Sequence, residues 1–264
     1  MTGPGVERPV ALVTGGARRV GRAICLALAR AGCAVQFTFR ESEVEARGLH
    51  AELVGAEPVS EVSRVLAFED RAMRLDLGDL AGVEALGERL ARAWPRLDVL
   101  VHNASMYGPT PIERIGAEEM MAHFRVNAAG PLLLTSHLTP LLARSLLPGG
   151  GAVVCLCDIH AMGRPRRNHA AYGMSKAALG EMVRTLAVDL APQVRVNGVA
   201  PGVVAFPESG PESQPEMQAR YLSRVPLARS GEPQDAAEAV RWLALEARYT
   251  TGTIVRVDGG RWLG

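Results

Sequence analysis

The chain has 264 residues, 48% hydrophobic and 22% charged, which suits one α/β domain with a sizeable core. Its formal net charge of +1 predicts no bulk binding to nucleic acid or anionic membranes. It shows neither an apolar leader pattern nor a run of ~18 apolar residues, so we expect a cytoplasmic protein without a membrane span.

Short apolar runs rich in β-branched residues alternate with helical patterns along the chain. Strands are predicted over 10–15, 34–40, 72–77, 97–104, 151–158, 193–202 and 253–260. Helices are predicted over 18–32, 41–54, 79–93, 117–146 (interrupted near Gly130 and Pro131), 170–190 and 233–246. Continuously apolar strands between helices indicate an α/β fold with a doubly wound, parallel, seven-stranded sheet. No linker divides the chain, so residues 1–264 are expected to form a single domain.

Two segments interrupt the alternation. Residues 55–71 lie between the second helix and the third strand and have the character of an insertion. Residues 205–226 are rich in Pro, Ser and Glu and include one short amphipathic piece, which suits a flap after a strand end or a plain surface excursion.

The first predicted strand runs directly into TGGARRVG (14–21), which then opens a helix. In a doubly wound sheet, such a turn places glycines and a helix N-terminus against a pyrophosphate. The position of Gly15 and Gly21 after the first strand of a βαβ unit therefore predicts a dinucleotide site. Arg18 adds a cation to this turn.

The end of the second strand bears on the choice of dinucleotide. An acidic side chain there would accept the ribose 2′-hydroxyl of NAD, whereas a guanidinium would pair with the 2′-phosphate of NADP. Arg40 and Ser42 favour NADP(H), although a shift of one residue would make Glu41 an acid of the NAD type. Further along the same edge, Asp76 and Leu77 are expected to meet the adenine.

The fourth predicted strand ends where the ligand crevice of a doubly wound sheet opens. The residues at that point are Asn103, Ala104 and Ser105.

Lys176 is the only lysine among the 29 Lys and Arg residues, and it follows Tyr172 by one helical turn. A tyrosine is a poor acid or base near neutrality, and a nearby ammonium is expected to lower its pKa. A compact ammonium also fits a crowded cleft better than a wide guanidinium. The alternative is a solvated lysine left by chance in an Arg-biased sequence.

These motifs together resemble the short-chain dehydrogenase/reductase family. The chain matches that family's order in the turn 14–21, Asn103-Ala104, Asn127, the pair Tyr172 and Lys176, and Pro201-Gly202. The resemblance implies a Rossmann-like fold, a homotetramer and hydride transfer from a nicotinamide. It assigns 1–150 mainly to the cofactor and 151–264 to catalysis and the substrate flap.

The same resemblance implies roles for individual residues. Tyr172 would donate a proton, Lys176 would hold the nicotinamide ribose, and Asn127 would bend its helix and position a water. The complete predicted cofactor set is Gly15, Arg18, Arg19, Val20, Gly21, Arg40, Ser42, Asp76, Leu77, Asn103, Ala104, Tyr172, Lys176, Pro201 and Gly202.

Two departures from the common family pattern resemble the pteridine reductases. Arg19 replaces a glycine of the first turn, and Asp158 takes the place of the usual serine after the fifth strand. The segments NASMYGPTP (103–111) and YTTGTIVRVDGG (249–260) are also similar to that subgroup. A carboxylate accepts hydrogen bonds or relays protons, whereas a serine hydroxyl donates to a ketone oxygen.

By this second resemblance, Tyr107 would stack on a pterin and Arg19 would contact both cofactor phosphate and pterin. Ser105 would bond to the pterin or a phosphate, and Asp158 with Tyr172 would deliver the proton. The expected substrate is of the dihydrobiopterin, dihydromonapterin or dihydrofolate type. A generic carbonyl reductase (3-oxoacyl or sugar ketone) is the alternative, and an inactive dinucleotide-binding regulator is a third.

Three further features of the sequence concern a histidine, a basic loop and two apolar stretches. His102 is expected to be structural. The basic loop, defined here as His160, Arg164, Arg166, Arg167 and His169, would be solvated or would receive an acidic part of a substrate or partner. Apolar stretches at 132–134 and 177–179 fit helices that pair across subunits in the resembled family.

Overall fold

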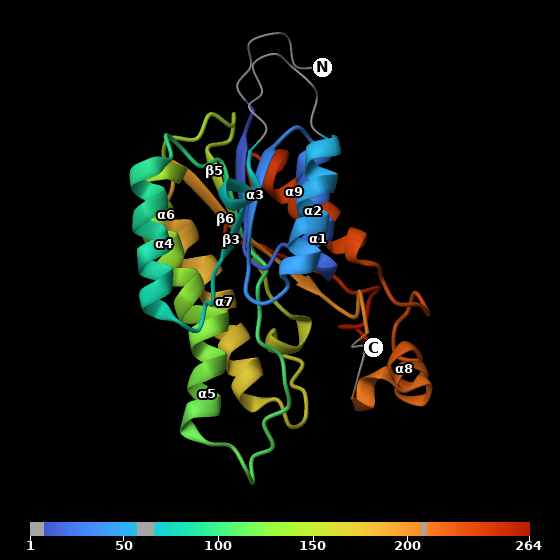
Figure 1. Cartoon of the computed structure of the whole chain (residues 1–264). Helices are drawn as coiled ribbons and strands as arrows, with labels where there is room; N and C mark the ends of the chain where they lie inside the picture. Colours follow the sequence, from blue (N-terminus) through green and yellow to red (C-terminus); the bar gives the residue numbers. More distant parts are fainter. Residues whose placement is uncertain (1–7, 57–65, 207–209) are drawn as a thin grey trace.

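A computed structural model describes residues 8–56, 66–206 and 210–264 (Figure 1). One sheet forms the centre of the molecule. Its strands are β1 Val10–Val13, β2 Ala34–Phe39, β3 Ala72–Arg74, β4 Val99–His102, β5 Gly151–Leu156, β6 Val194–Pro201 and β7 Ile254–Val257. All pairs are parallel and the strand order is β3-β2-β1-β4-β5-β6-β7. The predicted α/β fold with a single, doubly wound, seven-stranded sheet is confirmed.

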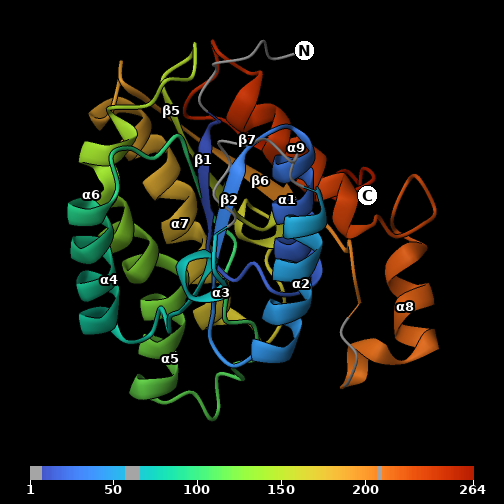
Figure 2. The same ribbon diagram turned by 45° about the horizontal axis from the view of Figure 1, so that its top comes forward.

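Helices cover both faces of this sheet (Figures 1 and 2). One layer holds α1, α2 and α9, and the other holds α4, α6 and α7. The helices are α1 Arg19–Arg30, α2 Glu43–Ala56, α3 Phe68–Arg71, α4 Leu80–Ala93, α5 Ala117–Phe124, α6 Gly130–Leu142, α7 Ala170–Asp189, α8 Pro215–Leu222 and α9 Pro233–Leu245. Short turns add a π-helical segment at Arg125–Ala129 and 3₁₀ turns at Ile159–Ala161 and Pro211–Ser213.

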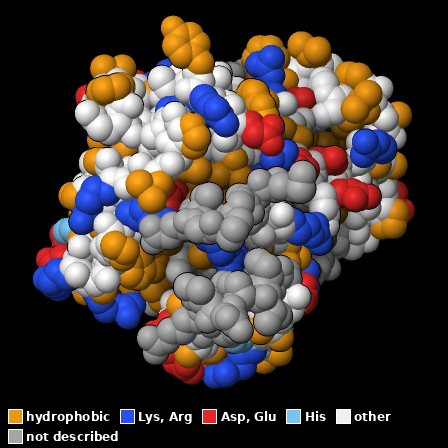
Figure 3. Space-filling model, turned by 90° about the horizontal axis from the view of Figure 1, so that it is seen from above, with side chains coloured by type: hydrophobic (Ala, Val, Ile, Leu, Met, Phe, Trp, Pro, Cys, Tyr) orange, Lys and Arg blue, Asp and Glu red, His pale blue; other side chains and the backbone are white. Residues whose placement is uncertain are grey.

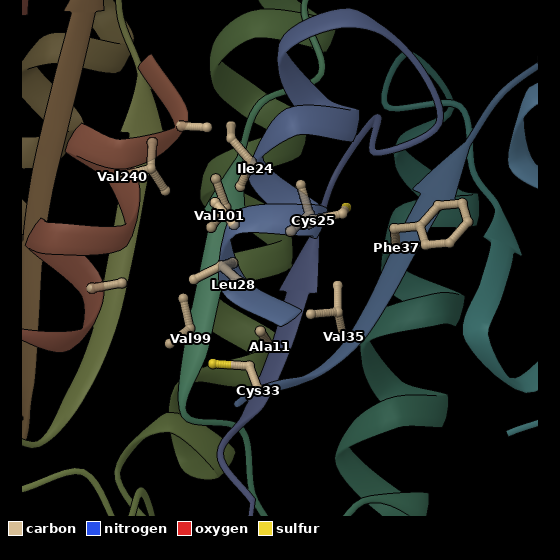
Figure 4. Packing of buried hydrophobic residues seen from close by; sticks show 14 of the residues in the cluster. Ala11, Ile24, Cys25, Leu28, Cys33, Val35, Phe37, Val99, Val101 and Val240 are labelled. Carbon is tan, nitrogen blue, oxygen red and sulfur yellow. The ribbon is translucent and has the colours of Figure 1, made fainter. Parts of the chain in front are cut away.

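The strands are apolar throughout because side chains leave a strand on alternate faces and both faces are buried. In β1, Ala11 and Val13 pack toward the α1 and α9 layer, whereas Leu12 packs toward the α4, α6 and α7 layer. Figure 4 shows Ile24 and Leu28 of α1 packed between the sheet and α9. Each face of the sheet is therefore covered by its own core.

Some predicted boundaries were wrong. The third strand ends at Arg74 rather than 77, although the Leu75 amide still donates to Phe39 O at 2.8 Å. The helix predicted over 117–146 divides into α5, a π-helical turn and α6, so its interruption begins at Arg125, ahead of Gly130. A wider helical turn there changes the direction of the side chains that follow.

The two irregular segments are only partly described. Of the predicted insertion 55–71, residues 57–65 lie outside the described residues, and Phe68–Arg71 form α3. Phe68 closes the end of β2, with its ring centroid 6.2 Å from that of Phe39. Of the predicted flap 205–226, residues 207–209 lie outside the description, and the remainder carries the turn Pro211–Ser213 and α8.

The face of the molecule seen in Figure 3 carries both positive and negative side chains. Basic and acidic side chains lie interspersed among apolar ones over the described part of this face. Among the helices of the described ranges, none is long and apolar enough to cross a bilayer.

The turn after β1 is fastened to the end of β4. The Asn103 side-chain amide donates to Thr14 O at 3.0 Å and to Gly15 O at 2.9 Å. A Cβ on Gly21 would lie 2.1 Å from Gly15 O and 2.6 Å from Asn103 Nδ2. The turn therefore closes only around a residue without a side chain at position 21.

We expect Gly21→Ala to lower the free energy of unfolding by about 2 kcal/mol, because the backbone must shift to admit the methyl group. Gly48→Ala in α2 is the matched control, since a Cβ there meets nothing within 4 Å. That change should raise stability by about 0.5–1 kcal/mol. Urea unfolding measures both variants, and a Gly21→Ala protein as stable as the wild type would contradict this packing.

Candidate active site

The first turn presents a helix N-terminus suited to an anion. Helix α1 begins at Arg19, and its N-cap residue, Arg18, makes no side-chain cap to the helix. No acidic residue lies in the first helical turn. Uncapped backbone N–H groups at a helix N-terminus carry partial positive charge and favour phosphate oxygens. The residues present therefore fit a dinucleotide pyrophosphate, as the sequence predicts.

Arg19 occupies a glycine-like backbone conformation. Its φ is +51°, and a non-glycine residue held there costs on the order of 1 kcal/mol or more. Its guanidinium Nη2 donates to Ala205 O at 3.0 Å and to Phe206 O at 3.2 Å. Arg19 thus links the turn after β1 to the segment that follows β6.

The predicted 2′-phosphate residues lie at the ends of β2 and α1. Arg40 directly follows β2, and its Nε is 3.1 Å from Glu41 Oε1. Arg18 lies 3.5 Å from Glu45. All four side chains are solvent-exposed, and exposed ion pairs of this kind contribute little stability and exchange readily for another anion. Ser42 is half-buried at the start of α2.

Leu77 is 4% exposed and its side chain packs in the core, and its predicted contact with an adenine stays a prediction. Asp76 is exposed, and its Oδ1 accepts from the amide two residues onward at 2.8 Å. Ala104 packs so closely on the first turn that a Cβ on Gly15 would lie 2.9 Å from its methyl. Val20 is half-buried and packs against the core behind this turn.

The residues after β6 also lie at this edge. The Gly202 amide donates to Val257 O at 2.9 Å. A Cβ on Gly202 would be 3.0 Å from the Cα of Asp258, so the chain turns tightly against the end of β7 after Pro201.

Tyr172 and Asp158 meet in the structure. The Tyr172 hydroxyl donates to Asp158 Oδ2 at 2.6 Å, and Asp158 Oδ1 accepts from the His160 amide at 2.7 Å. Tyr172 is 6% exposed and comes from the first turn of α7, whereas Asp158 follows β5. The carboxylate is therefore oriented from one side and bonded to the phenol from the other.

The pKa of Tyr172 is raised well above its usual value, first by burial and then by the charge of Asp158. Lys176 is not among the principal causes of this shift, so its predicted effect on the phenol stays a prediction. Lys176 is itself buried, its Nζ donates to Leu156 O at 2.7 Å, and burial lowers its own pKa. Tyr172 accordingly keeps its proton at neutral pH, because the usual pKa of a tyrosine is already about 10.

Asn127 lies in the π-helical turn between α5 and α6, where the predicted bend was placed. Its Oδ1 accepts from the Met106 amide and from Ser105 Oγ, and its Nδ2 donates to Met106 O and Ser175 Oγ, all at 2.8–3.0 Å. These partners fix the loop after β4 to α7. The predicted water stays a prediction. Ser175 was missed, although its place on the helix beside the Tyr172 turn was a usable signal.

Aromatic rings surround the Tyr172 phenol. The Tyr107 ring lies 4.9 Å from that of Tyr172, perpendicular to it, and 5.3 Å from that of His169, nearly parallel to it. Tyr107 is 43% exposed. Its hydroxyl donates to Glu212, whose carboxylate also pairs with Arg166.

Two arginines of the basic loop are paired within the chain instead of being fully solvated. Arg166 forms an ion pair with Glu212, and Arg164 Nη1 donates to Trp262 O at 2.9 Å. The sequence did not predict this contact of Glu212, because the composition of its segment, rich in Pro, Ser and Glu, singles out no residue. His102 is structural, as predicted: it is buried beside Thr135 Oγ1 at 2.7 Å, and burial lowers its pKa to about 3.

The four cysteines, Cys25, Cys33, Cys155 and Cys157, are buried and free. Within the described ranges, no cluster of three or more His, Cys, Asp or Glu side chains could hold a metal ion.

Several known proteins that this chain resembles are described as oxidoreductases or reductases. A family model described as enoyl-(acyl carrier protein) reductase matches residues 15–261. An uncharacterized oxidoreductase of Methylorubrum extorquens is 32% identical, over 97% of this chain and 98% of its own length. Pteridine reductase 1 of Leishmania tarentolae is 31% identical, over 96% of each chain. The 3-oxoacyl-[acyl-carrier-protein] reductase of Synechocystis is also 31% identical, over 95% and 96%.

We expect Asp158→Asn to lower the pKa of Tyr172, because an amide does not repel the phenolate. Alkaline titration of the tyrosine absorbance measures this, with Tyr172→Phe identifying the Tyr172 signal. Asp189→Asn, at an exposed carboxylate on the same helix, is the control and should leave the titration unchanged. An unaltered Tyr172 titration in Asp158→Asn would show that the carboxylate does not govern the phenol.

Proposed function

The chain belongs to the short-chain dehydrogenase/reductase family of NAD(P)(H)-dependent oxidoreductases, and we propose that it is an NADPH-dependent pteridine reductase. The proposed substrate is a pterin of the dihydrobiopterin, dihydromonapterin or dihydrofolate type. The observation that carries this proposal is the 2.6 Å hydrogen bond from the Tyr172 hydroxyl to Asp158. The relative described as pteridine reductase 1 supports it.

Asp158 favours a nitrogen-containing acceptor over a ketone. An ionised carboxylate has no proton to donate to a carbonyl oxygen, but it can accept from the ring N–H and amino groups of a pterin. Reduction of a C=N bond adds a hydride to carbon and a proton to nitrogen. Bound NADPH would supply the hydride. Tyr172 would hold the proton at its phenol oxygen, and Asp158 would orient the phenol and relay its replacement from solvent.

Electrostatics support NADPH as the cofactor. The first residue after β2 is Arg40, and the N-cap of α1 is Arg18, so two exposed guanidinium groups lie beside the dinucleotide turn. Their glutamate partners are also exposed and would give way to a doubly charged 2′-phosphate. Buried Lys176 is proposed to hold the nicotinamide ribose hydroxyls.

Tyr107, Ser105 and Arg19 would complete the substrate site. The exposed Tyr107 ring stands perpendicular to Tyr172 and offers a face on which a flat heterocycle can stack. Ser105 Oγ bonds to Asn127, which ties this loop to α7. Arg19 crosses the opening toward the segment after β6, between the proposed cofactor and substrate positions.

A carbonyl reductase is the second candidate. It is favoured by the 31% identity to a 3-oxoacyl-[acyl-carrier-protein] reductase over 95% of the chain. A regulator without catalysis is disfavoured by the hydrogen-bonded arrangement of Tyr172, Asp158 and Asn127.

We further propose that the protein is a cytoplasmic homotetramer. Exposed apolar side chains on neighbouring helices support assembly, with Leu132 of α6 at 47% and Met174 of α7 at 56% exposure. Leu134 and Leu179 from the same apolar stretches are instead buried within the subunit.

The test is oxidation of NADPH, with NADH in parallel, against dihydropterins, dihydrofolate and small ketones. The wild type should turn over at least one pterin and prefer NADPH. Asp158→Ser should lower kcat/KM for that pterin by about 100-fold or more while ketone turnover persists or rises. Turnover of ketones alone would contradict the pterin proposal and leave the family assignment intact.

A further inference from the structure

The segment between β6 and α8 reaches the candidate site through Glu212, in the 3₁₀ turn Pro211–Ser213. The Tyr107 hydroxyl donates to this carboxylate, with both Oε1 and Oε2 at 3.0 Å. Arg166 pairs with the same carboxylate, and the Arg166 and Glu212 side chains are 28% and 27% exposed. One carboxylate therefore joins three segments that are distant in sequence.

The other contacts of Tyr107 are all made by its ring. His169 lies nearly parallel to it, Tyr172 meets it perpendicularly, and the Arg166 guanidinium carbon lies 5.6 Å from its centroid. Ring contacts of this kind allow a range of orientations, whereas a hydrogen bond to the hydroxyl fixes one end of the ring. Among the described contacts, Glu212 is the partner that anchors that end.

The surroundings of the Tyr107 hydroxyl keep it protonated, so that it can donate to Glu212. Burial raises the pKa of the Tyr107 phenol, Arg166 opposes that effect, and Glu212 raises the pKa further. Asp158 acts in the same direction more weakly. The hydroxyl therefore remains protonated and donates, and Arg166 offsets the charge that Glu212 brings into a partly buried place.

We propose that Glu212 is a positioning residue that sets the orientation of the Tyr107 ring and thereby the enzyme's selectivity for planar substrates. Arg166 holds Glu212 in place. This inference rests on the proposed function, in which Tyr107 is the surface for stacking. Within the segment after β6, it names Glu212 as the residue that acts on Tyr107.

The test is a double-mutant cycle on Tyr107→Phe and Glu212→Ala with the preferred dihydropterin. Each single variant should raise KM about tenfold with kcat nearly unchanged, which corresponds to loss of one hydrogen bond to a charged group. The double variant should be no worse than either single one, because both remove the same contact. The dissociation constant for NADPH should not change.

Glu212→Gln and Glu216→Ala are the matched variants. Glutamine keeps an acceptor for the Tyr107 hydroxyl, so Glu212→Gln should retain a KM close to the wild type. Glu216 is an exposed acid on α8, and its removal should have no effect. Additive effects of the two single variants, or an equal loss for a pterin and a small ketone, would overturn the inference while leaving pterin turnover established. Absence of all pterin turnover would instead overturn the proposed function.

Discussion

The site depends on one geometric constraint, which is that the carboxyl ends of the parallel strands share one edge of the sheet. β1 and β4 are neighbours there, and the Asn103 amide fastens the turn after β1 to the end of β4. That contact fixes the N-terminus of α1, and the neighbouring strand β5 ends at the same edge, where Asp158 follows. Helix α7 packs on one face of the sheet, and its first turn brings Tyr172 to Asp158.

The hydrogen bond between Tyr172 and Asp158 gives the site its chemical character. A phenol whose pKa is raised by burial and a neighbouring carboxylate keeps its proton, which suits reduction better than proton abstraction. Lys176 is buried against Leu156 O and is absent from the principal influences on that phenol. A compact ammonium fits this closed space, whereas a wide guanidinium does not.

The sheet could be predicted because strands buried on both faces are apolar throughout and therefore stand out against helical periodicity. The glycine motif after the first strand also predicted the turn at Gly15, which the structure shows directly after β1. Contacts between distant segments could not be predicted in this way. Glu212 reaches Tyr107 only through the path of the chain after β6, and the side chain of Leu77 turns into the core although its neighbour Asp76 is exposed. The upward shift of the Tyr172 pKa comes mainly from burial, and residue spacing alone does not show which side chains are buried.

The central claim is that this chain transfers a hydride to a pterin ring carbon. It is tested most directly with NADPH carrying deuterium at both C4 positions of the nicotinamide, incubated with the enzyme and a dihydropterin. Mass spectrometry and proton NMR of the product should show one deuterium at a reduced carbon of the pterin ring. A pterin recovered unlabelled, while a ketone in the same mixture gains deuterium at its carbinol carbon, would contradict the account.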